Sequence, residues 1–420
     1  MKKKITVITL ATIIAATGTA FGSGYRIPEQ SMNSVALSGA YVANTQGADT
    51  SYFNPANMGW LADGWHSEAN LGYIHLTSID YADNDTPAKN GSSKKEDFLL
   101  PQLHLVSPAF GNFRFGLSVT YPAGLSKRWE AAFPKSSAED FTLKTYEFNP
   151  TVSYKISDRI AIGGGARIIH STGKVKSTAV DPIPGTVSLL IRDMKGDTTE
   201  YGYNLALTIK PVTNLTLAAT YRSKVDLDEE GDATLLAMSP AGGGTVIGTY
   251  SGGASVSVPV PAVLTFGAAY TFDRTTVELT YDKTYWNAYE QLDFNYTGAL
   301  TDPFNILTPA FDTPRARNWT NSEAYRIGVT HQFNEQWTMM AAFAIDKNPV
   351  PDNTLAFELP DSDAKIYSIG ARYQYNDKLL VGLAYLYDDK ESRTVTNSSV
   401  DGTFDNAAAH LVSANLQYRF

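Results

Sequence analysis

Cysteine is absent from this chain of 420 residues. Disulfides therefore play no part in its fold, and metal sites built from thiolate ligands are excluded. The six histidines lie singly on separate segments, and neither a Gly-x-Ser-x-Gly nor a His-Glu-x-x-His motif occurs. Because these motifs mark serine and zinc hydrolases, we expect no catalytic residues, no metal and no cofactor.

Charge and long apolar runs are also scarce. Charged residues make up 18% of the chain, and the net charge of -9 disfavours nucleic acid as a partner. Beyond the first residues no apolar stretch reaches the ~18 residues of a membrane-spanning helix, so helical spans are excluded. Aromatic residues are plentiful, with 24 tyrosines and 19 phenylalanines. This enrichment is typical of the aromatic girdles of a membrane β-barrel.

The first residues have the layout of a secretory signal peptide. Lys2, Lys3 and Lys4 precede an apolar run over residues 5–16, and small residues follow it before Ser23. The run is too short for a lasting membrane anchor. The alternative, a buried N-terminal helix, fits poorly with the lysines. We therefore expect residues 1–22 to be removed on export.

The rest of the chain alternates between apolar and polar side chains. From His410 to Phe420, for example, Val412, Leu416 and Tyr418 alternate with polar residues. This period of two predicts a strand with one apolar face, and a terminal aromatic resembles the C-terminal signal of outer-membrane barrels. The same alternation recurs around residues 201–210, 215–222, 276–282, 325–333 and 367–373.

Tight turns near residues 158, 334 and 376 alternate with longer polar segments. We place these longer loops at about 80–97, 178–195, 226–258, 296–318 and 390–405. Short turns alternating with long loops predict an up-and-down transmembrane antiparallel β-barrel of roughly fourteen strands. The acidic group Asp226, Asp228, Glu229, Glu230 and Asp232 falls in one of these loops. It is read as a solvated acidic loop, with a Ca²⁺ site as the alternative.

Energetics assign the two faces of the barrel. A charge at mid-depth on the lipid face costs about 2–4 kcal/mol. The charged strand residues must therefore face inward or lie at the membrane edge: Arg222, Glu278, Asp282, Arg326, Arg372 and Arg419. Residues 379–387 carry apolar side chains on both faces. Such a mixed lumen suits an apolar or amphipathic solute, or packing against a plug.

Residues 23–60 do not fit a strand pattern. They are small, neutral and rich in serine, alanine and glycine. We expect an N-terminal hatch (plug) over 23–66 that folds inside the lumen, and a barrel over 67–420.

The chain contains an ordered set of motifs: residues 23–31 (SGYRIPEQS), Gly39-Ala40-Tyr41, Asn54-Pro55-Ala56, Pro261 to Leu264, 281–287 (YDKTYWN), Trp319, 324–328 (AYRIG), Pro349-Val350-Pro351 and Leu359-Pro360-Asp361. This ordered set resembles the FadL family of outer-membrane transporters for long-chain fatty acids and toluene-like hydrocarbons. The resemblance covers essentially the whole mature chain, apart from the 226–258 and 296–318 loops.

The resemblance implies a plugged barrel that captures an apolar solute, binds it near the mature N-terminus and releases it sideways after the hatch rearranges. Asn54, Pro55 and Ala56 match the gating motif of the hatch, although a plain Asn-Pro turn is the alternative. Ser23, Gly24, Tyr25 and Ile27 would lie nearest the ligand, or else form a frayed terminus. Pro122 and Gly124 would mark the kink of the third strand, or merely a turn.

Other ligand-binding candidates follow from residue chemistry. Leu125, Lys127, Arg128, Trp129 and Phe133 combine cations and aromatics after the third strand. Such a mixture suits a carboxylate with an acyl chain, or lipopolysaccharide phosphate. Deeper in the lumen, Arg167 and Arg326 are candidates for a carboxylate, the alternative being pairs with acidic residues of the wall or hatch.

One position departs from the family. Fatty-acid-transporting relatives typically carry a lysine after the tryptophan, where this chain has Thr320. An uncharged hydrocarbon therefore gains weight against a fatty acid.

We accordingly expect a passive carrier of hydrophobic small molecules in the Gram-negative outer membrane, in contact with lipid and lipopolysaccharide. The family precedent implies a monomer. A general diffusion porin is the main alternative, followed by an outer-membrane lipid-modifying enzyme.

Overall fold

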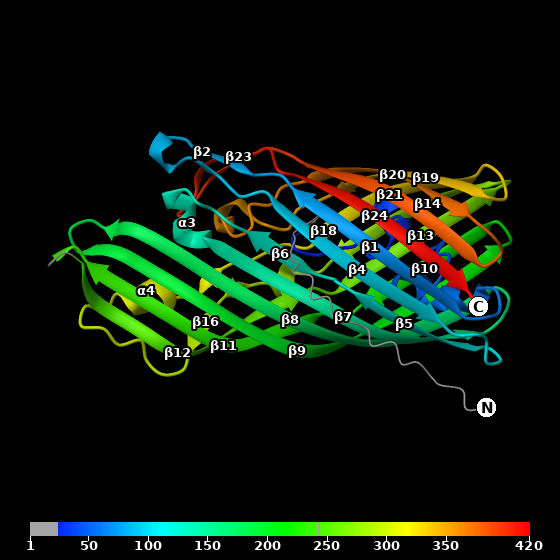
Figure 1. Cartoon of the computed structure of the whole chain (residues 1–420), viewed down its shortest axis with the longest axis horizontal. Helices are drawn as coiled ribbons and strands as arrows, with labels where there is room; N and C mark the ends of the chain where they lie inside the picture. The colour runs from blue at the N-terminus through cyan, green and yellow to red at the C-terminus, as the bar shows by residue number, and fades with distance from the viewer. Residues whose placement is uncertain (1–23, 242–243) are drawn as a thin grey trace, which may run out of the picture.

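The computed structural model describes residues 24–241 and 244–420. The expected signal peptide and Ser23 lie outside these residues. The fold is a closed antiparallel barrel of 14 strands, as expected, with the C-terminus at one end (Figure 1). None of the helices in the described part of the chain is long and apolar enough to cross a membrane.

Each strand pairs antiparallel with the next around the ring, and the last closes onto the first. The strands that form the closed ring are β1 (His66–Leu76), β4 (Glu96–Val106), β5 (Phe113–Thr120), β7 (Asp140–Lys155), β8 (Ile160–Ile183), β9 (Val187–Val212), β10 (Leu215–Arg222), β13 (Val263–Phe272), β14 (Thr275–Thr284), β18 (Ser322–Gln332), β19 (Trp337–Asp346), β20 (Ala364–Gln374), β21 (Leu379–Lys390) and β24 (Ala408–Arg419).

Side chains on the strands alternate between the lipid and the lumen. Tyr201, Leu279 and Leu383 are more than half exposed on the outer surface, whereas Glu278, Asp282 and Arg326 are buried inside. The expectation that these three charged residues face inward is confirmed. An apolar outer face and a polar inner face identify the wall of a membrane barrel.

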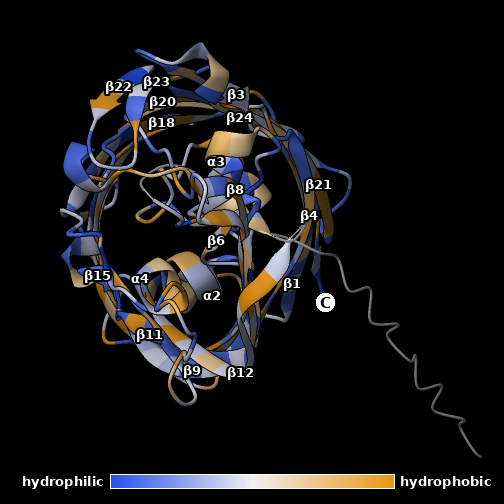
Figure 2. Ribbon diagram, turned by 90° about the vertical axis from the view of Figure 1, so that its left-hand side faces the viewer, coloured by the Kyte–Doolittle hydropathy of each residue, from blue (hydrophilic) through white to orange (hydrophobic). Residues whose placement is uncertain are grey.

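The two ends of the barrel differ. Short connections join β7 to β8, β18 to β19 and β20 to β21, at the turns predicted near 158, 334 and 376. Seen from the opposite end, the strands form a ring with α2 inside its outline (Figure 2). Short turns face the periplasm and long connections face the exterior in such barrels.

Two of the predicted loops are strands instead. Residues 178–195 continue β8 and β9, and residues 226–258 form the hairpin of β11 (Val225–Ser239) and β12 (Thr245–Val260). These hairpins extend the wall beyond the other strands (Figure 1). Asp228, Glu230 and Asp232 are exposed on the outer face of β11, which places this strand above the hydrocarbon. Glu229 and Gly231 interrupt the apolar inner face of β11, and the strand was therefore missed.

The exterior end is capped by shorter elements. They are β2 (Asp80–Asp83), η2 (Pro87–Lys89), β3 (Gly91–Ser92), β6 (Gly124–Lys127), α3 (Ala132–Ala138), η4 (Trp286–Ala288), β15 (Gln291–Leu292), β16 (Phe294–Tyr296), α4 (Leu307–Phe311), β17 (Arg315–Ala316), η5 (Asp352–Thr354), β22 (Arg393–Thr396) and β23 (Asp401–Asp405).

The segment before β1 folds inside the barrel. It contains α1 (Met32–Ala36), α2 (Thr50–Phe53) and η1 (Pro55–Trp60), and most of its side chains are buried. Small wall residues make room for it. A Cβ added at Gly382 would lie 2.1 Å from Met32, and one at Gly163 would lie 2.6 Å from the backbone of Ala56. We refer to residues 24–60 as the hatch.

Buried polar contacts join the hatch to the wall. Glu278 of β14 accepts hydrogen bonds from the backbone N–H groups of Val42, Ala43 and Asn44, at 2.7, 2.7 and 3.0 Å. Arg222 of β10 donates to the carbonyl of Tyr52 and lies over its ring. These contacts satisfy hatch backbone groups that have no access to water.

The third strand is interrupted where it meets the hatch. β5 ends at Thr120, and the chain resumes as β6. Between them the carbonyl of Pro122 accepts from the N–H of Ile27 at 3.0 Å, and Gly124 donates to the carbonyl of Tyr25 at 2.9 Å. β4 consequently pairs with β5 only from Leu103 to Val106. The chain thus leaves the wall at Pro122 to pair with the N-terminal residues of the hatch.

Candidate functional site: an apolar cavity above the hatch

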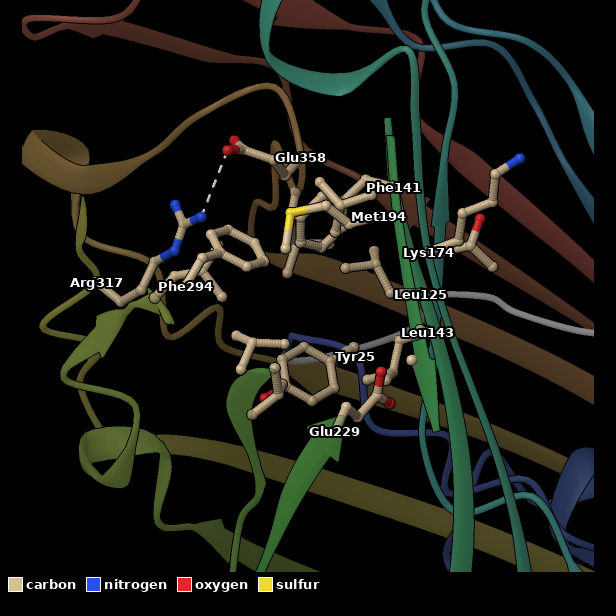
Figure 3. Close-up of a pocket in the computed structure, with 18 of the residues that line it drawn as sticks. Tyr25, Leu125, Phe141, Leu143, Lys174, Met194, Glu229, Phe294, Arg317 and Glu358 are labelled. Carbon is tan, nitrogen blue, oxygen red and sulfur yellow. Dashed lines mark hydrogen bonds and ion pairs between the residues drawn. The ribbon is translucent and has the colours of Figure 1, made fainter. Parts of the chain in front are cut away.

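A cavity of about 850 Å³ lies between the hatch and the exterior end of the barrel (Figure 3). We call it the outer cavity. Strands and loops from most of the chain contribute apolar side chains to it. They include Leu125 of β6, Phe141 and Leu143 of β7, Val175 of β8, Met194 of β9, Val256 and Val258 of β12, and Leu292, Phe294, Trp319, Val350 and Leu359. A cavity with such a largely apolar lining and a few polar groups is typical of a small-molecule site.

Tyr25, at the start of the described chain, lines the inner end of this cavity. Its ring packs edge-on against Trp286 and lies near Trp319, with ring centroids 4.6 and 5.7 Å away. Its hydroxyl donates to the carbonyl of Pro259 at 2.5 Å. Gly24 has a φ of +69°, and a Cβ there would lie 2.6 Å from Trp286, so only glycine fits. The aromatic cluster therefore fixes Tyr25 in place.

Few charged groups point into the outer cavity. Arg317 and Glu358 form an ion pair at 3.4 Å, and Glu229 also lines the cavity (Figure 3). Burial alone would raise the pKa of Glu358, but Arg317 and Arg315 hold it below its ordinary value. Lys174 contributes only the base of its side chain. Its ammonium points away from the cavity and pairs with Asp140 at 2.8 Å.

The outer cavity opens toward the exterior. A vestibule of roughly 1810 Å³, which includes open solvent, lies between α3, α4 and the loops before β20 and β23. The vestibule and the outer cavity share four lining residues: Arg317, Thr354, Ala356 and Glu358. The vestibule and the outer cavity therefore adjoin at these residues.

A second cavity, of about 720 Å³, lies on the other side of Tyr25. We call it the inner cavity. Its lining includes Arg26 and Tyr52 of the hatch and Arg167, Arg222 and Asp282 of the wall. Val258 lines the outer cavity and Val260 the inner one, and Tyr25 bonds to the carbonyl of Pro259 between them. Tyr25 thus stands at the boundary between the two cavities.

The candidate residues of the sequence lie in several places. Tyr25 and Leu125 line the outer cavity, whereas Ile27, Pro122 and Arg167 line the inner one. Lys127 lines a side cavity of about 450 Å³, which shares Leu359 with the outer cavity. Its side chain has no ion-pair partner among the described residues. Phe133 lines the vestibule.

The remaining cationic and aromatic candidates pack into the structure around the cavity. Trp129 is buried and donates to the carbonyl of Phe357 at 2.9 Å. Arg128 is half exposed and lies 3.5 Å from Glu96. Arg167 pairs with Glu147 at 2.9 Å, and Arg326 pairs with Asp282 at 2.8 Å. Both arginines are therefore paired with wall carboxylates, which is the alternative that the sequence left open.

The Asn-Pro-Ala motif links the hatch to itself and to the wall. The side chain of Asn54 donates to the carbonyl of Val42 at 2.7 Å and to the hydroxyl of Thr208 on β9 at 2.8 Å. Its oxygen accepts from the N–H of Ala56 and so caps η1. Pro55 occupies the first turn of η1, where no backbone donor is needed. Asn54 thus does more than form an isolated turn.

Several cavity residues were missed by sequence reasoning. Val256, Val258 and Glu229 lie in a segment read as a loop, and Met194 lies at the end of another. Val225, Leu227, Ala233 and Leu235 preserve an apolar inner face along β11, and this alternation was the available signal.

Residues 13–420 match the family described as outer membrane protein transport protein (OMPP1/FadL/TodX). The long-chain fatty acid transport protein of Salmonella typhi is 24% identical over 318 residues, covering 69% of each chain. A Pseudomonas aeruginosa FadL homologue has a similar structure, with a TM-score of 0.79, 19% identity and coverage of 95% of this chain and 100% of that one. The Pseudomonas putida toluene transporter TodX gives a TM-score of 0.72 at 18% identity, with coverage of 96% and 100%.

These comparisons identify the functional class of the protein and its location in the cell. The family consists of outer-membrane transport proteins, so the expectations that the chain is not an enzyme and that it lies in the outer membrane are confirmed. The chain belongs to the FadL/TodX family of outer-membrane transport proteins.

Proposed function

We propose that the protein carries hydrophobic small molecules, either long-chain fatty acids or hydrocarbons, passively across the outer membrane. The observation that carries this proposal is the apolar outer cavity, which adjoins a vestibule on one side and is bounded by Tyr25 on the other. The names of the relatives, a long-chain fatty acid transport protein and a toluene transporter, agree with such a solute.

Capture begins in the vestibule. Phe133 and Phe311 offer apolar surface there, and the shared boundary at Arg317 leads into the outer cavity. Each CH₂ group that leaves water gains about 0.8 kcal/mol. Burial of the solute therefore drives its inward movement, and the chain needs no energy source.

Onward movement requires the hatch to rearrange. Tyr25 lies between the outer and inner cavities, and the N-terminal residues pair with the kink of the third strand through Pro122 and Gly124. Displacing Tyr25 would therefore loosen the same backbone contacts that hold the kink. We assign the gating contacts within the hatch to Asn54, Pro55 and Ala56, because Asn54 joins η1 to the wall.

Exit is proposed to be sideways, between β4 and the third strand. The ladder between β4 and β5 contains only four residue pairs, so few backbone bonds must break there. An apolar solute prefers the bilayer to the aqueous periplasm by the same free energy per CH₂ group. Lateral release avoids the periplasm.

Two features bear on the choice between a fatty acid and a hydrocarbon. Thr320 donates to the carbonyl of Pro349 and is not among the lining residues of the outer cavity, so it offers no cation to a carboxylate. Lys127, which has no ion-pair partner in the described ranges, supplies a cation at the neighbouring side cavity. A fatty acid would use Lys127, whereas a hydrocarbon would not. A Lys127→Met variant separates the two, because it should weaken oleate uptake and leave toluene uptake unchanged.

The surroundings of the barrel follow from the same proposal. We expect a monomer in contact with outer-membrane lipid and lipopolysaccharide. A general diffusion porin is the rival function. The buried hatch argues against it, because its side chains fill the lumen.

Uptake in a Gram-negative host without its own transporter tests the proposal. Cells expressing the protein should take up oleate or toluene faster than cells with an empty vector. Val256→Trp should abolish the gain, because its side chain would fill the outer cavity. Val246→Trp is the matched control, since Val246 lies on the same strand and is exposed. Equal uptake by all four strains would refute the proposal.

A further inference from the structure

Glu229 lines the outer cavity, and transport of a plain hydrocarbon does not explain why an acidic residue is there. It lies on β11 with its side chain turned inward, and it is 4% exposed. Its neighbours Asp228 and Glu230 are exposed on the outer face. Across the strand pair it faces Val256, a lining residue of the outer cavity. One carboxylate of the acidic group is thus directed into an apolar cavity.

The wall is shaped to receive this carboxylate. Gly173 of β8 and Gly196 of β9 are cross-strand partners, and the side chain of Glu229 lies against both. A Cβ at Gly173 would lie 1.9 Å from Oε2 of Glu229. The hydroxyl of Ser171 donates to Oε1 at 2.5 Å. Any other residue at position 173 would displace the carboxylate, so its position depends on this glycine.

Glu229 has no counter-charge. It forms no ion pair with any described residue, and Ser171 is the one described donor to it. The cations that line the cavity are engaged elsewhere, Arg317 with Glu358 and Lys174 with Asp140. Lys195 is exposed on the outer face. A carboxylate removed from water without a counter-charge destabilises a fold unless donors satisfy it. Oε2 of Glu229 therefore remains open to a hydrogen-bond donor that enters the cavity.

We propose that the outer cavity takes hydroxylated hydrocarbons, such as phenols and long-chain alcohols, and that Glu229 accepts the hydrogen bond of their hydroxyl group. This inference rests on the proposed binding of hydrophobic solutes in the same cavity. The hydrocarbon part contacts Phe294, Met194 and Val256, while the hydroxyl donates to Oε2. An ionised carboxylate on the solute would be repelled at this end of the cavity. Glu229 therefore selects for a donor and against an anion.

A pair of probes that differ in one hydroxyl tests the inference. The affinities of 4-butylphenol and butylbenzene are measured by titration calorimetry on the purified full-length protein in detergent. Hydrogen bonds to charged groups favour the phenol by roughly tenfold or more. The Glu229→Leu variant should bind butylbenzene at least as well as the wild type and lose the preference for the phenol. Glu230→Gln is the matched control, because Glu230 is exposed on the other face of the strand, and it should keep the full preference.

The outcomes separate this inference from the proposed function. Equal affinity of the wild type for both probes, or an unchanged preference in Glu229→Leu, would overturn the role of Glu229 while leaving the cavity a binding site. Binding of neither probe to the wild type would refute the proposed function as well. If Glu229→Leu does not fold, Glu229→Gln preserves the shape and the Ser171 contact. It should reduce the preference for the phenol without abolishing it, and a full preference would contradict the inference.

Discussion

The two cavities on either side of Tyr25 are similar in size but differ in the charged groups that line them. The outer cavity of about 850 Å³ is lined mainly by apolar side chains, with Glu229 as its unpaired acid among the described lining residues. The lining of the inner cavity of about 720 Å³ includes four charged residues that form ion pairs, Arg26, Arg167, Arg222 and Asp282, beside apolar ones. The outer cavity is suited to binding a solute, whereas the charged groups of the inner cavity are suited to holding the hatch against the wall.

The difference indicates that solute binding and closure of the barrel by the hatch depend on separate sets of contacts. Apolar contacts in the outer cavity are non-directional, so they accept a range of solute shapes. Ion pairs and hydrogen bonds in the inner cavity are directional, and they fix the hatch in one arrangement against the wall. A solute can therefore be held without the contacts that close the barrel being altered.

Removal of the hatch should have the largest effect on the difference between the two cavities. Deletion of residues 23–60 should merge both cavities into one water-filled lumen, and we expect a steady open conductance in planar bilayers. The intact protein should show little conductance under the same conditions. An unchanged trace after the deletion would refute the plug.

The charge cluster of the inner cavity offers the next largest effect. Glu147 is fully buried between Arg167 and Arg222. Glu147→Leu would leave two buried arginines without their carboxylate and should cost about 3–5 kcal/mol of unfolding free energy. Urea unfolding in detergent measures the loss. Asp158→Asn removes an exposed ion pair and should change stability by less than ~1 kcal/mol. Equal effects of the two variants would contradict a structural role for the cluster.

The role of Tyr25 as the boundary between the two cavities can be tested by removing one oxygen atom. Tyr25→Phe removes the hydroxyl that donates to Pro259 and keeps the aromatic packing. The loss of about 1 kcal/mol should make brief openings roughly fivefold more frequent in single-channel recordings. Tyr385→Phe removes a comparable hydroxyl from the outer surface and should leave the frequency unchanged. The assignment of Tyr25 as divider fails if both variants resemble the wild type.

The smallest expected effect concerns pH and the outer cavity. Burial raises the pKa of Glu229 to about 7, the hydrogen bond from Ser171 opposes that rise, and Asp197 adds to it. Glu229 gains a proton as the pH falls through this value and then becomes a weaker acceptor. Arg317 and Glu358 also line the cavity and remain paired. The preference for 4-butylphenol should therefore be a few-fold larger at about pH 8.5 than at about pH 5.5.

Glu229→Gln provides the control for this titration. An amide does not titrate, so its preference should be flat across the same range. A slope that persists in this variant would assign the effect to another group.

Strand alternation was enough to predict the barrel and much of its wall, because side chains facing lipid must be apolar. The same rule fails above the membrane. On β11 the outer face is acidic, so Glu229 differs from Asp228 and Glu230 only by sharing the alternation of Leu227 and Ala233, which was not recognised as a strand. The pairing of Arg167 with Glu147 likewise depends on the register of β7 and β8. The inner-face glycines at 163 and 382 were a readable signal for a plug, since each faces the hatch.

The longest hairpin, formed by β8 and β9, extends far beyond the membrane. β8 and β9 contain 24 and 26 residues, and at ~3.3 Å per residue they span about 80 Å. With a tilt of roughly 40°, this gives about 60 Å of height, against an apolar band of ~25 Å. More than half of this hairpin therefore lies outside the apolar band of the membrane. A hydrophobic solute that approaches from outside therefore meets these strands before it reaches the apolar band of the membrane.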